Sequence, residues 1–286
     1  MRDAGEQYAG GAPRVSVCVP VYNGGAFIGE TLRSILAQTF RDFELLVTDN
    51  RSTDGTVEIV RKFTDPRIRL VINDTNLGAI GNFNAALAQA RGERVKVVCA
   101  DDLLAPTCLE EQVAALDAAP GAVLACCARR IVDHRGKGWM VRRFPGHAGR
   151  VPGREAIARV IRSGTNPVGE PMAVLMDRAA VIRLGGFDAN WKFCVDVDLW
   201  CRLLTLGDAV IQGGALCSFR VSPGSWSTAL GAGQAAEFER FVTGAVQRFP
   251  GLVTEVDAAR AIRRARLLAK LRGLFYRLLF GGRARN

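Results

Sequence analysis

Apolar residues recur with two different periods along the first hundred positions of the chain. Short β-branched runs predict four buried strands, at 15–22, 43–50, 68–74 and 94–100. Helical spacing between them predicts three helices, at 26–38, around 57–60 with Ser52 as its N-cap, and at 81–92. Strands that alternate with helices of this length indicate an α/β protein with a Rossmann-like, doubly wound and mainly parallel sheet.

The pattern is less regular beyond residue 109, although helices and strands still alternate. We expect a basic loop that contains Trp139 and ends near Arg154. The remaining predicted elements are helices at 109–118, 154–162 and from 195, strands at 122–128 and 173–178, a turn at 185–188, and a run at 209–227. These segments complete one domain over 14–230, between a flexible N-terminal tail at 1–13 and a basic, helical C-terminal region at 231–286.

Polar residues follow each of the four predicted strands. They are Tyr22 and Asn23, Asp49, Asn76, and the pair Asp101 and Asp102. In a parallel sheet ligands bind beyond the carboxyl ends of the strands, so we expect one crevice to collect these side chains. The first turn reads NGGAFIGE and lacks GxGxxG, which argues against a nicotinamide or flavin enzyme.

Asp101 and Asp102 are adjacent carboxylates where a buried strand ends. Two ionised carboxylates about 4 Å apart repel by roughly 4 kcal/mol at an effective dielectric constant of 20. A hard cation such as Mg²⁺ or Mn²⁺ offsets this repulsion, because it takes oxygen ligands and is completed by water and phosphates. The alternative is a solvated loop or a helix cap.

Composition fits a folded protein and excludes several kinds of chemistry. Of 286 residues, 49% are apolar and 23% charged. The eight cysteines form no CxxC pair, and only two histidines occur, so zinc chemistry and a Ser-His-Asp triad lack components. There is no apolar run long enough for a membrane span, and the N-terminus lacks the apolar core of a signal peptide, so we expect a cytoplasmic protein.

The formal charge of +10 is concentrated at the C-terminus. Nine basic residues and no acid follow Asp257, which leaves about +1 for the rest and argues against a nucleic-acid partner. Residues 258–280 combine a broad apolar helical face with arginines and lysines. Such a basic amphipathic helical tail fits an anionic membrane surface, here the inner face of the cell membrane. The alternatives are packing on the domain and a homodimer contact.

Several segments together resemble family 2 glycosyltransferases, which are inverting enzymes of the GT-A fold that use nucleotide-sugar donors. The segments are VSVCVPVYNGGAFIGETLRSILAQTFRDFELLVTDNRSTDGT, NLGAIGNFNAALAQARGERVKVVCADDLL, NPVGEPMAVLMDR, GGFD, DVDLWCRL and FRVSPGS. They occur in the family's order and cover residues 14 to about 228. The resemblance implies a nucleotide-binding half at 14–108 and an acceptor and catalytic half at 109–230.

The resemblance assigns donor contacts to the predicted crevice. Asp49 would accept a hydrogen bond from the ring N–H of a uracil or thymine base, Tyr22 would stack on that base, and the main chain around Pro20 would line its pocket. Asp102 would bind Mg²⁺ or Mn²⁺, and Asp101 would contact ribose or share the metal through water. The metal would stabilise the departing nucleoside diphosphate.

On the acceptor side the resemblance assigns the catalytic base to Asp196, with Asp198 two residues further on. The alternative for both is helix capping, since acids in the first turn of a helix favour its dipole. Asn166, Gly169 and Glu170 would shape the acceptor site, with Glu170 as the direct contact; the alternative for Glu170 is a buried structural carboxylate. Trp191 and Trp226 on loops could stack on a sugar, whereas Trp200, inside a helix pattern, is expected in the core.

The chain departs from the family pattern at three places. Val195 replaces the glutamate that often precedes the base. Ser222 stands where many members carry a histidine that binds metal. Arg220 remains a candidate phosphate contact, with a structural ion pair as the alternative. Asn50 and Arg51 replace the family's Asp-Gly.

The predicted function is transfer of a sugar from a nucleoside-diphosphate sugar, a UDP-sugar, to a hydroxyl of a saccharide or lipid-linked saccharide in cell-envelope polysaccharide synthesis. One rival is a sugar-1-phosphate nucleotidyltransferase, which needs a basic, Gly-rich loop that VYNGGAFIGE does not offer. The other is a membrane-associated nucleotide-binding scaffold, in which Asp196 has no catalytic role.

Overall fold

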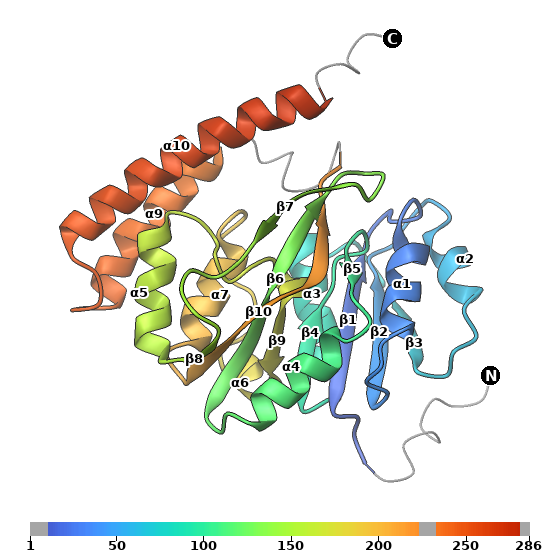
Figure 1. Ribbon diagram of the computed structural model, residues 1–286. Coiled ribbons are helices and arrows are strands. Elements are labelled where there is room, and N and C mark those ends of the chain that lie inside the picture. Colours follow the sequence, from blue (N-terminus) through green and yellow to red (C-terminus); the bar gives the residue numbers. More distant parts are fainter. Residues whose placement is uncertain (1–10, 223–232, 281–286) are drawn as a thin grey trace.

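The computed structural model describes residues 11–222 and 233–280, and its first hundred residues alternate strands and helices (Figure 1). The parallel strands β1, β2, β3 and β4 and their connecting helices confirm the predicted order. The elements are β1 (Val15–Val21), α1 (Ile28–Leu36), β2 (Phe43–Asp49), α2 (Thr56–Arg61), β3 (Ile68–Ile72), α3 (Gly78–Gln89) and β4 (Arg94–Val97).

One local prediction in this region is wrong. Ser52 does not cap α2, because its hydroxyl accepts a hydrogen bond from the Asn23 backbone N–H at 2.9 Å. The Asp54 carboxylate instead accepts from the Thr56 backbone N–H at 3.0 Å, beside Gly55 at the N-cap. Ser52 therefore links the ends of β1 and β2 rather than starting a helix.

The second half of the domain extends the same sheet with strands of both directions. It contains β5 (Leu103–Leu104), α4 (Cys108–Asp117), β6 (Ala122–Val132), β7 (Gly138–Arg142), β8 (Gly149–Val151), α5 (Gly153–Ser163), η1 (Pro171–Ala173), β9 (Val174–Asp177), α6 (Arg178–Arg183), α7 (Val195–Leu203) and β10 (Asp208–Arg220). The prediction of a basic loop before Arg154 is wrong in part, since β7 and β8 lie there and pair antiparallel with β6 and β10.

The ten strands in the described part of the chain form one mixed sheet whose main path is β3-β2-β1-β4-β9-β6-β10-β5. The short strand β9 runs antiparallel to both of its neighbours, β4 and β6. The predicted mainly parallel pairing therefore holds for β1 to β4 and for β6 with β10, while β5, β7, β8 and β9 are antiparallel.

Helices cover both faces of the sheet. On one face α1 meets α4, where the Leu109 backbone N–H donates to the Gln38 side chain at 3.0 Å. On the other face α3 meets the segment before α7, since Asn84 donates to the Phe187 carbonyl at 2.8 Å and the Phe187 ring packs edge-on against Trp200. Trp200 is fully buried, which confirms its expected place in the core.

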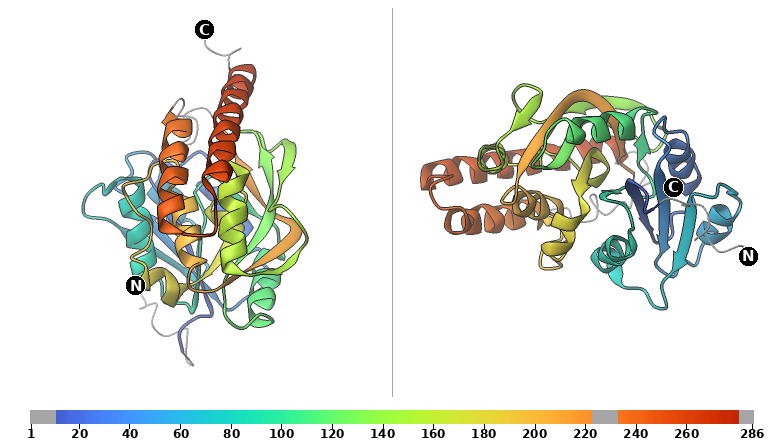
Figure 2. Two further views of the ribbon diagram at one scale, coloured as in Figure 1. Left: turned by 90° about the vertical axis from the view of Figure 1, so that its left-hand side faces the viewer. Right: turned by 90° about the horizontal axis from the view of Figure 1, so that it is seen from below.

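Two antiparallel helices complete the described chain, α9 (Gly233–Arg248) and α10 (Glu255–Phe280). Helix α10 packs along α9 and against α5, with Ala258, Ala261 and Ala265 buried (Figure 2). The same helix exposes Leu267, Leu271 and Leu274. Packing on the domain, one of the alternatives for 258–280, is therefore present. No helix in the described parts of the chain is long and apolar enough to cross a bilayer.

The carboxyl end of β1 has no strand neighbour on one side, because β4 ends before β1 does. The pairing of β1 with β4 ends at Cys18 with Val97, whereas its pairing with β2 continues to Val21. The Cys18 carbonyl accepts from the Val98 N–H at 2.8 Å, so the Pro20 backbone, two residues on, faces the same side beyond the end of β4. Proline is tolerated there because its missing N–H has no strand partner to lose.

Candidate active site

Asp49 ends β2 with a carboxylate that is only half satisfied. Its side chain is 1% exposed, and one oxygen accepts from the Ser52 backbone N–H at 2.9 Å. The second oxygen, Oδ1, is buried and has no hydrogen-bond partner among the described residues. Because a buried acceptor without a partner is unfavourable, this atom fits the predicted hydrogen bond to a base N–H.

The two residues that replace the family's Asp-Gly have separate structural roles. Asn50 is buried and bridges strand ends, donating to Asn76 at 2.8 Å and accepting from Asn73 at 3.0 Å and from the Leu77 N–H at 2.9 Å. Arg51 has a φ of 66°, a left-handed conformation that costs a non-glycine residue about 1 kcal/mol or more. A position suited to glycine thus holds an exposed cation beside Asp49.

Tyr22 and Asn23 lie at the adjacent end of β1. The Tyr22 ring is 52% exposed and accessible to a stacking partner. Asn23 adopts a φ of 50° and accepts from the Thr53 backbone N–H at 2.8 Å, so its side chain holds the two turns together.

Asp101 and Asp102 follow β4, and Arg220 at the end of β10 anchors them. The Asp102 side chain is fully buried. Its Oδ1 accepts from the Arg220 backbone N–H at 3.1 Å, whereas Oδ2 has no hydrogen-bond partner within 11–222 and 233–280. The Arg220 guanidinium donates to the carbonyls of Asp101 at 2.9 Å and His134 at 3.1 Å and pairs with Glu30 at 2.7 Å. Arg220 therefore positions the carboxylate pair, and its predicted phosphate contact stays a prediction.

The carboxylate pair fits a divalent cation in part. Burial raises the pKa of Asp101, and burial together with repulsion from Asp101 raises the pKa of Asp102. A cation facing the unpartnered Asp102 oxygen would offset both effects. No group of three or more His, Cys, Asp or Glu side chains within 11–222 and 233–280 is placed to hold a metal. A bound ion would therefore need water and phosphate as further ligands.

A cavity of about 660 Å³ lies next to this pair and contains Asp196. Asp101, Glu170 and Arg220 also line it, together with Asn166. Its opposite wall comes from α10 through Leu268, Leu271, Arg272 and Phe275. Asp49, Asp102 and Tyr22 are not among its lining residues, so Asp101 and Arg220 join the donor side to the Asp196 side.

Asp196 lies in the first turn of α7 and is partly exposed to the cavity. Its carboxylate makes no hydrogen bond within the described ranges, so it does not cap the helix. Burial and the nearby Glu170 charge raise the pKa of Asp196 to about 8, while Arg129 opposes the shift. A carboxylate of this basicity, aimed into a cavity, is suited to accept a proton from a hydroxyl.

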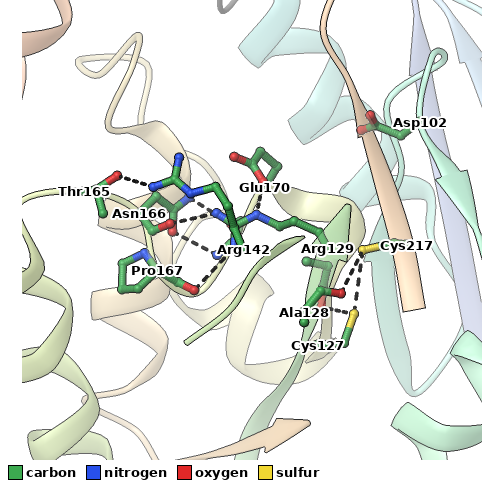
Figure 3. Close-up of polar contacts among 12 residues, drawn as sticks. Asp102, Cys127, Ala128, Arg129, Arg142, Thr165, Asn166, Pro167, Glu170 and Cys217 are labelled. Carbon is green, nitrogen blue, oxygen red and sulfur yellow. Dashed lines mark hydrogen bonds and ion pairs between the residues drawn. The ribbon is translucent and has the colours of Figure 1, made fainter. Parts of the chain in front are cut away.

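Glu170 is paired with Arg129, whose side chain is fully buried (Figure 3). Burial alone would raise the pKa of Glu170, but Arg129 and Arg142 outweigh it and lower the pKa. The Arg129 guanidinium also donates to the Asn166 carbonyl at 2.9 Å. Gly169 has a φ of 121°, and a Cβ at this position would lie 2.8 Å from Ala173. The absence of a side chain therefore lets this turn lie close to both Ala173 and Arg129.

Asp198 and Trp191 do not line the cavity. Both Asp198 oxygens are used, by Arg202 at 2.6 Å and by Arg248 on α9 at 2.8 Å, and the residue is 1% exposed. The Trp191 ring stacks edge-on against Phe241 and lies under Arg240, so it packs on α9. The structure thus separates these two residues from Asp196, and Trp226 lies outside the described residues.

Sequence reasoning missed Arg129, Arg142 and the wall contributed by α10. Arg129 carried a weak signal, since it ends the apolar run AVLACCA where a buried cation is unusual. Arg142 fell in a segment interpreted as a loop. The α10 residues were recognised as an apolar face, but periodicity does not report what such a face contacts.

The chain belongs to glycosyltransferase family 2. The family model named glycosyl transferase family 2 matches residues 16–185, and the residues matched include Asp49, Asp101, Asp102 and Glu170. Asp196 and α10 lie beyond the matched range. The predicted membership is thereby confirmed.

Named relatives support the same family. EpsE of Bacillus subtilis, named as a glycosyltransferase, is 31% identical over 203 residues, 68% of each chain. An uncharacterized protein of Mycobacterium tuberculosis is 35% identical over 200 residues, 67% of this chain and 62% of its own length. The UDP-Glc:α-D-GlcNAc-diphosphoundecaprenol β-1,3-glucosyltransferase WfgD of Escherichia coli is 38% identical over 99 residues, 35% of this chain and 39% of its own.

Solved structures share the fold. TarS of Staphylococcus aureus in complex with UDP-GlcNAc has a TM-score of 0.68 at 23% identity, covering 88% of this chain and 71% of TarS. The mannosyltransferase PcManGT of Pyrobaculum calidifontis, in complex with GDP-Man and Mn²⁺, has a TM-score of 0.66 at 23% identity, covering 96% of this chain and 77% of that one. The predicted GT-A fold is confirmed by these similarities.

Proposed function

We propose that the protein is a metal-dependent, inverting glycosyltransferase that moves a sugar from a UDP-sugar to a hydroxyl of a saccharide or lipid-linked saccharide acceptor. The observation that carries this proposal is the shared cavity, in which Asp196 has no hydrogen-bond partner within the described ranges and Asp101 belongs to the donor side. Inversion needs one base opposite the leaving group, and Asp196 alone supplies it.

The chain's own residues account for binding and proton transfer. Asp49 accepts from the base N–H through its unpartnered oxygen, and Tyr22 stacks on the base from its exposed position. Asp196 takes the proton of the acceptor hydroxyl as that oxygen attacks the sugar carbon. Mg²⁺ or Mn²⁺, held by Asp102 with Asp101 nearby, would stabilise the negative charge of the departing diphosphate.

The relatives favour a role in cell-envelope polysaccharide synthesis. The name of WfgD describes a UDP-Glc donor and a diphosphoundecaprenol-linked acceptor, and TuaG of Bacillus subtilis is named for teichuronic acid biosynthesis. The PcManGT complex contains Mn²⁺ in the same fold, which favours a divalent metal here.

Helix α10 supports a peripheral contact with an anionic membrane at the cytoplasmic face. Leu267, Leu271 and Leu274 are exposed on it beside exposed Arg266 and Lys270, a combination that fits the headgroup region of a bilayer. Association through this face with a second copy of the chain is the alternative. Sedimentation with phosphatidylglycerol vesicles, compared with neutral vesicles, distinguishes the two.

The test is the variant Asp196→Asn, assayed for UDP-sugar turnover and for UDP affinity. Because general bases typically contribute about 10²- to 10⁴-fold, turnover should fall by that factor while UDP affinity stays within about twofold. Asp188→Asn is the matched control, since an amide oxygen can keep the bonds that Asp188 accepts from Asn190. Unchanged turnover in Asp196→Asn would contradict the mechanism, whereas UDP binding without any turnover in the wild type would favour a nucleotide-binding scaffold.

A further inference from the structure

A second cavity, of about 550 Å³, adjoins the one that contains Asp196. It lies between the segment after β7, helix α5 and helix α10. No acidic side chain is among the described residues that line it. We call it the arginine cavity after its six arginines, Arg129, Arg142, Arg143, Arg159, Arg162 and Arg264.

The lining of the arginine cavity is positively charged. Three of its arginines have carboxylate partners, Glu170 for Arg129, Glu155 for Arg159 and Asp257 for Arg162. Those three carboxylates do not line the cavity. Six guanidinium groups line the cavity and no carboxylate is among its described lining residues, so an anion in the cavity would relieve their mutual repulsion.

Several of these groups are fixed before any ligand binds. The buried Arg129 guanidinium donates to the Asn166 and Pro167 carbonyls, at 2.9 and 3.4 Å, as well as to Glu170. Arg142 donates to the Thr165 hydroxyl at 3.1 Å (Figure 3). Rigid guanidinium forks and hydroxyl groups are the donors that proteins use for phosphate oxygens.

A glycine brings α10 into the wall of this cavity. Gly164 ends α5 with a φ of 67°, and a Cβ there would lie 2.8 Å from the Ala261 carbonyl and 3.1 Å from the Arg264 Cβ. The absence of a side chain lets the end of α5 contact α10 directly, so that Arg264 on α10 reaches the same cavity as Arg162 on α5.

The two cavities share Arg142 and Thr165 as lining residues. A ligand that occupies both would therefore place an anionic group among the arginines and another part beside Asp196. In the proposed function the diphosphate of the donor lies with the metal at Asp101 and Asp102. The group that the arginine cavity would hold thus belongs to the acceptor.

We propose that the arginine cavity binds a phosphate or diphosphate group of the acceptor while the acceptor hydroxyl lies at Asp196. The role of this group as part of an acceptor rests on the proposed transferase function. Binding of the anion itself can be measured without any turnover. A diphosphate suits the site better than a single carboxylate, because it brings several charges and more oxygens to six guanidinium groups.

The test measures binding of inorganic diphosphate by calorimetry in the absence of donor. EDTA is present so that no divalent metal binds diphosphate at Asp101 and Asp102. The variant pair Arg143→Ala/Arg264→Ala removes two exposed cavity arginines, and Arg154→Ala/Arg263→Ala removes two exposed arginines that do not line it. We expect at least tenfold weaker binding in the first pair, wild-type affinity in the control pair, and unchanged melting temperatures in both.

Competition and acceptor analogues complete the experiment. Saturating UDP should leave diphosphate binding intact, because UDP occupies the donor side. Equal affinity in both variant pairs, or full displacement by UDP, would overturn the proposal. Unchanged turnover in Asp196→Asn would instead contradict the transferase mechanism. It would leave this binding result unaffected.

The source of the phosphate is read from two further probes. Farnesyl diphosphate that binds more tightly than glucose 1-phosphate identifies a lipid-linked diphosphate, since Leu268, Leu271 and Phe275 of the adjoining cavity would accept the isoprenyl chain. The reverse order identifies a phosphorylated saccharide. Failure of both probes to bind, with inorganic diphosphate also silent, would overturn the site.

Discussion

The carboxylates of the donor side and those of the acceptor side differ in their hydrogen-bond and ion-pair partners. At the donor side Asp49 and Asp102 are buried, accept from backbone N–H groups, and each keep one oxygen without a partner. At the acceptor side Glu170 and Asp198 are neutralised by arginines from distant segments. Asp196 is the exception there, with its carboxylate exposed to the cavity and its pKa raised to about 8.

This difference separates residues that hold the fold together from residues that have chemistry to perform. A buried acceptor that backbone geometry leaves unsatisfied is costly, so it persists where a ligand completes it. A buried carboxylate enclosed by arginines has its charge compensated already and serves packing. Asp196 and Asp198 lie two residues apart on α7, yet they fall on opposite sides of this division.

The largest effect expected is on stability, from Asp198→Ala. Removing this carboxylate leaves Arg202, which is 12% exposed in its side chain, without its charge partner and detaches Arg248 of α9. Breaking a buried pair by removing one partner typically lowers the free energy of unfolding by about 3–5 kcal/mol. Chemical denaturation followed by circular dichroism measures the loss.

Asp117→Ala is the matched control for Asp198. Asp117 also pairs with two arginines, Arg14 and Arg94, but its side chain is 42% exposed. Exposed pairs contribute about 0–1 kcal/mol, so this variant should change stability little. Equal losses from Asp198→Ala and Asp117→Ala would show that burial does not distinguish the two carboxylates.

The donor side could be predicted from the sequence because local pattern determines it. Strands alternating with helices place Asp49, Asp101 and Asp102 at successive strand ends, and the sheet brings strand ends together. The prediction of Ser52 as the helix cap failed, because only the structure shows that the Ser52 hydroxyl accepts from the Asn23 N–H.

The acceptor side was less predictable because it depends on contacts between distant segments. Asp196 and Asp198 look equivalent in the first turn of a helix, and the partner that distinguishes them, Arg248, lies fifty residues further on. The apolar face of 258–280 left membrane binding, packing and dimerisation open. The burial of Ala261 and the place of Phe275 in the cavity wall were not visible in the periodicity.

A smaller effect is expected from pH, acting through Asp196. The carboxyl must be ionised to accept a proton, so kcat/KM should rise about tenfold per pH unit below 8 and level off above it. Between pH 6 and 8 the gain is about fiftyfold, or about 2.3 kcal/mol. Rates measured with saturating metal over pH 5.5–9.5 test this profile.

The acid–base groups that face Asp196 are Glu170, which raises its pKa, and Arg129, which lowers it. Glu170→Gln removes the repulsion and releases Arg129 from its partner, so it should shift the profile to lower pH. Because the folded state binds the Asp196 proton more tightly than the unfolded chain, stability should fall as pH rises from about 4 to 8. Asp196→Asn should remove that contribution, and a profile that neither variant moves would contradict the assignment.

The smallest effect expected is on nucleotide affinity, from Asp49→Asn. The amide oxygen can still accept from the Ser52 N–H, but its NH₂ group then occupies the position of the unpartnered oxygen. It cannot accept from a base N–H, so the loss of one hydrogen bond to a charged acceptor should weaken UDP binding by about 1.5–2 kcal/mol, ten- to thirtyfold. Calorimetric titration with UDP measures it, and Asp74→Asn, an exposed carboxyl just past the neighbouring strand β3, is the control for lost charge. Equal affinities for wild type and Asp49→Asn would show that the base binds elsewhere. Unpartnered buried oxygens would then no longer identify the donor-binding residues.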